Sequence, residues 1–164
     1  MLVVAIGNPW RGDDGAARAV GELLATEPGI TVRPVLQLTP ELAAELAREK
    51  RVVFVDADRR RRHASLERMN EASGAPRESR AAVAHEVSID EVVTTARRLF
   101  DFEGEVWLCR VPAHRFRLEV GLSPSTAREV GPAAAAVRAL LYGDLPERSA
   151  PRTTEGANQA GASE

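Results

Sequence analysis

Two adjacent aspartates, Asp13 and Asp14, stand in a loop whose composition suits a bound cation. The loop, residues 7–15, follows an apolar run (residues 1–6) that predicts a buried strand, and a helical pattern begins directly after it. In open α/β sheets, ligands bind beyond the carboxyl ends of the strands. Because the loop is acidic and lacks the G-x-G-x-x-G pattern, it is a poor phosphate site. Its carboxylates favour a metal ion instead.

Two further side chains belong to the same predicted edge of the sheet. Asp56 follows the apolar run at residues 52–55, and His85 lies just before a helix start at Ser88. Right-handed crossovers bring the carboxyl ends of parallel strands to one side, so Asp14 and Asp56 can converge despite their separation in sequence. Two carboxylates and an imidazole would form a three-ligand site for a divalent metal such as nickel or zinc, with positions left open for substrate or water.

Each of these residues also has a structural interpretation. Asp13 and Asp14 could cap the first helix and complement its dipole. Asp56 could be a turn residue at the end of a strand, and a histidine before a helix is more often structural or solvated than a ligand. From residue types and spacing alone, both interpretations stay open.

A regular alternation of strand and helix patterns must position these residues. Strands are expected at residues 2–6, 30–35, 52–55, 65–69 and 105–111, and helices after residues 15, 39, 88 and 123. This order predicts an α/β fold, a three-layer α/β/α sandwich with a mostly parallel five-stranded sheet.

Polar residues mark the predicted helix starts. Thr39 before a proline predicts an N-cap, and so does Ser123 before Pro124. Ser88 and Glu91 have the spacing of a capping box, in which each side chain accepts a hydrogen bond from the other residue's backbone.

Length and composition limit the class of protein. A chain of 164 residues predicts one domain over residues 1–143, and the Pro-, Ser-, Thr- and Gly-rich residues 144–164 predict a disordered tail. The net charge of −2 disfavours a nucleic-acid partner, and the single cysteine, Cys109, excludes an intrachain disulfide. The apolar start is too short for a membrane span and lacks signal-peptide features, so no membrane partner and a cytoplasmic location are expected.

Three segments together resemble one enzyme family. The sequences AIGNPWRGDDG (residues 5–15), VFVDA (53–57) and AHEVS (84–88) occur in this order, and they resemble those of hydrogenase maturation proteases. Those enzymes remove a C-terminal extension from the large subunit of nickel–iron hydrogenases after nickel insertion. The first motif is specific, whereas the other two are weak alone.

The resemblance implies roles for individual residues. Asp14, Asp56 and His85 would contact the metal and carry the cleavage, and Asp13 would support them. The substrate-facing loop would comprise Gly7, Asn8, Trp10, Gly12, Asp13 and Gly15. Nickel would arrive with the substrate, a precursor of the hydrogenase large subunit, and zinc or another divalent ion could substitute for it. The metal could activate water or polarise the peptide carbonyl, or serve only for recognition while a carboxylate acts as base.

The sequence departs from the family after Asp56-Ala57, where Asp58 and four arginines (residues 59–62) replace a turn containing glycine and proline. The arginines are either a solvated loop or a docking site for acidic groups. Two other functions stay open: a nickel-binding chaperone of the hydrogenase subunit without catalysis, and a magnesium-dependent phosphatase using Asp56 and Asp58.

The remaining candidate residues have simpler interpretations. Cys109, inside an apolar strand, is expected to be a buried small hydrophobe rather than a nucleophile. Ser123 is expected to be a cap, and His114 to lie on the surface. Of the two tryptophans, Trp107 is expected in the core and Trp10 in contact with substrate.

Overall fold

The computed structural model describes residues 1–69 and 87–143. In this part the strands are β1 (Leu2–Ile6), β2 (Thr31–Val35), β3 (Arg51–Asp58), β4 (Ser65–Arg68) and β5 (Glu105–Pro112). The α-helices are α1 (Ala16–Leu24), α2 (Leu42–Leu46), α3 (Ile89–Phe100) and α4 (Pro124–Tyr142), and a 3-10 helix, η1 (Gly12–Gly15), precedes α1.

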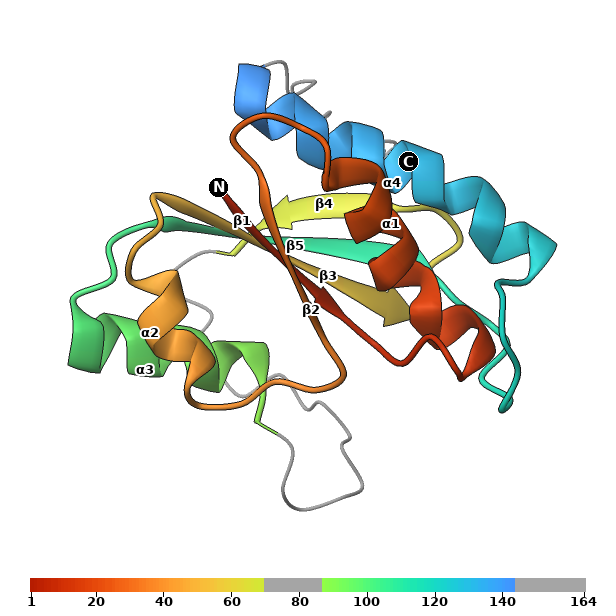
Figure 1. The fold of residues 1–164 in the computed structure, drawn as a ribbon, viewed down its shortest axis with the longest axis horizontal. Helices are drawn as coiled ribbons and strands as arrows, with labels where there is room; N and C mark the ends of the chain where they lie inside the picture. The colour runs from red at the N-terminus through yellow and green to blue at the C-terminus, as the bar shows by residue number, and fades with distance from the viewer. Residues whose placement is uncertain (70–86, 144–164) are drawn as a thin grey trace, which may run out of the picture.

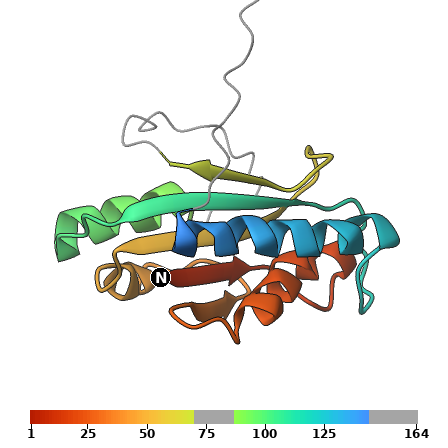
Figure 2. The same cartoon turned by 90° about the horizontal axis from the view of Figure 1, so that it is seen from above.

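The strands form one mostly parallel sheet, as the sequence predicts. Its order is β2-β1-β3-β5-β4, with β4 antiparallel to β5 and the other pairs parallel. β2 and β4 lie at the two edges (Figure 2). The central strand β1 and residues 52–55 of the central strand β3 are continuously apolar, which suits strands whose two faces are both covered.

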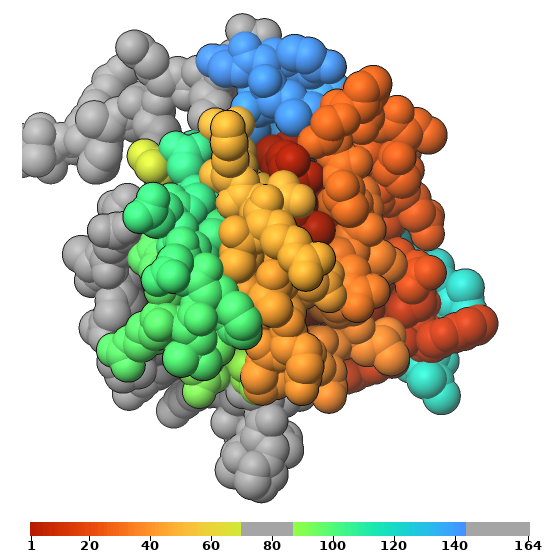
Figure 3. Space-filling model, turned by 60° about the vertical axis from the view of Figure 1, so that its left-hand side comes forward, coloured from red at the N-terminus to blue at the C-terminus, as the bar shows by residue number. Residues whose placement is uncertain are grey.

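Alternate residues of these central strands supply two separate cores. Val3, Val53 and Val55 pack with α1 and α4 on one face of the sheet. Val4 and Phe54, which point the other way, pack with α2 and α3. Figure 1 shows these two helix pairs on opposite sides of the sheet, and the space-filling view in Figure 3 shows α2 and α3 side by side over their face. The three-layer α/β/α architecture is therefore confirmed.

Two of the three predicted caps are confirmed. The capping box between Ser88 and Glu91 is present, and the Ser123 side chain accepts a hydrogen bond from the backbone of Thr126 at the start of α4. The prediction for Thr39 is wrong, since α2 begins only at Leu42 and has no side-chain cap. The preceding residues instead form a turn in which the Leu42 N–H donates to the Thr39 carbonyl (3.2 Å).

The register of the sheet positions the predicted site. Ala5 of β1 pairs with Val55 of β3, so the loop that leaves β1 starts next to Asp56. Among the described helices, none has the length and apolarity that crossing a membrane requires. The predicted tail at residues 144–164 lies outside the described residues.

Candidate active site

The loop after β1 folds back on itself. Gly7 has a φ of +146°, and a Cβ there would lie 2.0 Å from the Asp14 carbonyl oxygen, so only glycine fits. The Asn8 side-chain oxygen accepts a hydrogen bond from the Trp10 N–H (2.9 Å), and the Asn8 N–H donates to Oδ2 of Asp14 (3.0 Å). A Cβ on Gly15 would lie 3.1 Å from the Pro9 Cα. Because of these contacts, Asp14 lies next to the carboxyl end of β1.

Asp14 and Asp56 interact electrostatically at this edge of the sheet. Burial raises the pKa of Asp56 to about 6; the Ala57 N–H opposes this rise, and the negative charge of Asp14 adds to it. Neither Oδ1 of Asp14 nor Oδ2 of Asp56 accepts a hydrogen bond from the residues that the structure describes. A cation between the two carboxylates would relieve their repulsion and use these oxygens.

Asp58 and Arg110 hold the end of β3 in place, a role that the sequence analysis missed. Arg110 pairs across the sheet with Asp56, and its Nη1 donates to Oδ2 of Asp58 (3.0 Å). Arg61 lies 3.8 Å from the same Asp58 oxygen. The available signal was Arg110 itself, a charged residue inside an apolar strand. These ion pairs occupy the carboxylate that the phosphatase alternative needs.

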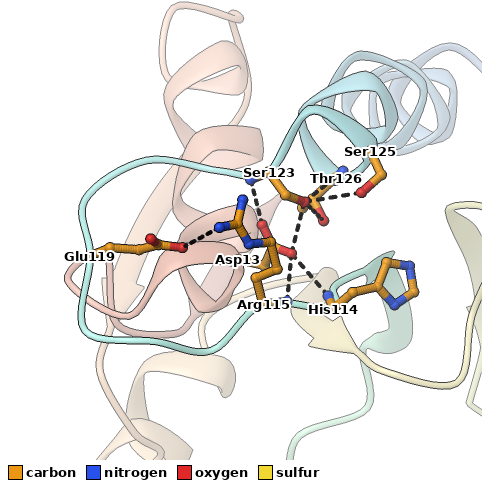
Figure 4. A network of polar contacts seen from close by, with 7 residues as sticks. All are labelled: Asp13, His114, Arg115, Glu119, Ser123, Ser125 and Thr126. Atoms are coloured by element: carbon orange, nitrogen blue, oxygen red, sulfur yellow. Dashed lines mark hydrogen bonds and ion pairs between the residues drawn. The ribbon is translucent and has the colours of Figure 1, made fainter.

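Asp13 connects the site loop to the segment between β5 and α4. Its carboxylate is fully buried. It accepts hydrogen bonds from the backbone N–H groups of His114 (2.9 Å), Arg115 (2.8 Å) and Ser123 (2.6 Å), and from the Ser123 hydroxyl (2.9 Å). Figure 4 shows the donors converging on Asp13 from that segment and from the start of α4. Asp13 thus supports the site loop by bonding a distant segment rather than by capping α1, which has no side-chain cap.

The hydrogen bonds to Asp13 change the pKa of its carboxyl group more than burial does. Burial alone would raise the pKa of this carboxyl, but the donors from His114, Ser123 and Arg115 lower it to about 2. Asp13 is therefore ionised at neutral pH and has no free oxygen for a metal, whereas Asp14 and Asp56 each have one that accepts no hydrogen bond from residues 1–69 and 87–143.

The third predicted ligand, His85, lies outside the described residues. Within residues 1–69 and 87–143, no three His, Cys, Asp or Glu side chains are grouped closely enough to hold a metal ion. The described part of the chain therefore supplies two neighbouring carboxylates, and a complete three-ligand site would need a group from elsewhere.

The other candidate residues have positions that limit their chemistry. Cys109 is buried, and burial raises the pKa of its thiol to about 12, as expected for a structural residue. The Ser123 hydroxyl is engaged with Asp13, and the His114 side chain is exposed. Trp107 is half-buried against the core, whereas Trp10 is 63% exposed within the loop after β1.

Comparison with solved structures identifies the fold. The chain is similar to the hydrogenase maturating endopeptidase HybD from E. coli, with a TM-score of 0.67 and 19% identity over 87% of this chain and 91% of that one. It is also similar to the [NiFe] hydrogenase maturation protease HybD from Thermococcus kodakarensis, with a TM-score of 0.62 and 24% identity over 85% and 97% of the two chains.

A third similar structure is the [NiFe] hydrogenase maturation protease HycI from Thermococcus kodakarensis KOD1, with a TM-score of 0.66 and 18% identity over 86% and 91% of the two chains. By sequence, no protein-family model and no curated protein matches the chain. The fold that the motif resemblance implies is confirmed.

Proposed function

We propose that this protein is an endopeptidase that removes the C-terminal extension of a nickel–iron hydrogenase large subunit after nickel insertion. The observation that carries the proposal is the meeting of Asp14 and Asp56, each with an oxygen free of hydrogen bonds from the described residues, at the carboxyl edge of the sheet. The fold shared with maturation proteases supports it, as do the three motifs.

In the proposed reaction, the nickel belongs to the substrate. The precursor presents a nickel ion that it already holds, and Asp14, Asp56 and His85 complete the ion's coordination. This contact positions the scissile peptide bond, so cleavage depends on correct metal loading. The proposed partner is the precursor itself, and no metal of the enzyme's own is required.

Water is the proposed nucleophile. Cys109 is buried with a raised thiol pKa, and the Ser123 hydroxyl is hydrogen-bonded to Asp13, so neither is available for attack. Addition of water to the peptide carbonyl breaks the C–N bond and leaves a new carboxylate on the mature subunit and a free amine on the released peptide.

We expect Asp14→Asn and His85→Ala to lower the rate of cleavage of nickel-loaded precursor by about 100-fold or more, because the scissile bond loses its positioning contact. The rate is measured from the mass of the precursor over time. Asp101→Asn is the matched control, since Asp101 is an exposed residue in the left-handed conformation that asparagine tolerates well.

Full activity of both variants would contradict the proposed site. A stable complex of wild-type protein and precursor without any change in mass would instead support the nickel-binding chaperone, which lacks catalysis.

A further inference from the structure

We propose that three arginines beside the site, Arg60, Arg62 and Arg117, form a surface that binds a carboxylate-rich segment of the protein partner. We call these three residues the basic rim. The inference deepens the proposed function, because it assigns a chemistry to the part of the partner that surrounds the cleavage site.

The basic rim is built from two loops that lie side by side. One loop follows β3 and carries Arg60 and Arg62, and the other follows β5 and carries Arg117. The Arg59 guanidinium lies 4.0 Å from the ring centroid of Phe116, which joins the two loops by a cation–π contact. Since β3 and β5 are paired in parallel, both loops leave the sheet at the same edge as Asp56.

The charges of the basic rim are not balanced within the described part of the chain. Other arginines nearby have partners: Arg61 pairs with Glu67 (3.0 Å) and Arg115 with Glu119 (3.7 Å). The three rim side chains are exposed and make no ion pair with the residues that the structure describes. Because the whole chain has a net charge of −2, this positive surface is a local feature. An anionic partner would relieve the repulsion among the three guanidinium groups.

Carboxylates of a protein segment are anions that fit this surface. A guanidinium group binds a carboxylate through two parallel hydrogen bonds. Leu118 and Val120, in the same loop as Arg117, are 88% and 75% exposed, so they offer aliphatic contacts to a peptide. The site therefore combines an acidic centre for the partner's cation with a basic rim for its acidic residues.

The test uses the full-length protein and a fluorescein-labelled oligo-glutamate peptide at low ionic strength, with binding measured by fluorescence anisotropy. An oligo-glutamine peptide and a labelled oligouridylate serve as comparison ligands. The variant Arg60→Gln, Arg62→Gln, Arg117→Gln removes the rim charges and leaves Arg59 on Phe116. The matched control, Arg48→Gln, Lys50→Gln, Arg98→Gln, removes three exposed charges at the opposite edge of the sheet.

We expect wild type and control to bind oligo-glutamate equally and oligo-glutamine not at all. The rim variant should bind oligo-glutamate about tenfold more weakly, because each of the three lost arginine–carboxylate pairs at an exposed site should weaken binding about twofold. It should unfold at the same urea concentration as wild type. The proposal is overturned by absence of wild-type binding, by equal loss in both triple variants, or by tighter binding of oligouridylate. Because the assay contains neither nickel nor precursor, its outcome is independent of whether the protein cleaves.

Discussion

Replacing Asp13 with alanine should destabilise the protein by about 3–5 kcal/mol, one of the largest effects that a single substitution has. The change leaves the buried N–H group of Ser123 and the partly buried N–H groups of His114 and Arg115 without their acceptor. It also disconnects the loop after β1 from the start of α4. Both carboxylate oxygens of Asp13 are engaged in hydrogen bonds within the protein, so the defect should be one of stability.

Urea unfolding followed by circular dichroism measures this effect. Asp90→Ala, at an exposed aspartate in the first turn of α3, is the control and should cost less than about 1 kcal/mol. An equally small cost for Asp13→Ala would show that the hydrogen bonds to Asp13 do not stabilise the fold.

The contribution of Asp13 to the free energy of unfolding should also depend on pH. Its pKa is about 2 in the folded protein against 3.8 in the unfolded chain. The stabilisation is thus fully present above pH 4 and is lost as the pH falls toward 2. The shift corresponds to about 2 kcal/mol, and this pH dependence should be absent from Asp13→Ala.

Replacing Asp56 with asparagine should stabilise the protein at neutral pH and abolish cleavage. Burial and the charge of Asp14 disfavour the ionised form of Asp56, whose pKa is about 6. The asparagine side-chain oxygen can still accept the hydrogen bond from the Ala57 N–H that Asp56 accepts (2.8 Å). Asparagine removes the unfavourable charge but no longer offers a carboxylate to nickel. We therefore expect higher stability with at least about 100-fold slower cleavage.

The direction of the pH effect follows from the raised pKa. Between pH 3.8 and 6 the folded protein binds the Asp56 proton more tightly than the unfolded chain does, so wild-type stability falls as the pH rises through this range. The free energy of unfolding of Asp56→Asn should equal that of wild type below pH 4 and exceed it by at most about 3 kcal/mol above pH 6. Urea unfolding in the presence of a chelator measures this difference in stability. A variant less stable than wild type at pH 8 would contradict the unfavourable burial of this charge.

Most of the fold was predictable because its signals are local. Continuous apolar runs marked β1 and β3, and Ser88 and Ser123 marked the starts of α3 and α4. Thr39 failed as a cap because a cap prediction uses only neighbouring residues, whereas the chain there completes a turn before α2 begins.

The site was predictable only in part. The nearness of Asp14 and Asp56 followed from the parallel arrangement of β1 and β3. The partners of Asp13 lie about a hundred residues away in sequence, so no local pattern could have identified them. The ion pair between Asp58 and Arg110 likewise depends on the register between β3 and β5. The part played by His85 stays a prediction from the motif.

The proposed function requires that the protein recognise the nickel held by the precursor. The most direct measurement compares the rate at which wild-type protein cleaves nickel-loaded precursor with the rate for the same precursor purified without nickel. We expect rapid release of the C-terminal peptide from the loaded precursor and essentially none from the nickel-free one. Equal rates on the two precursors would contradict the proposed function.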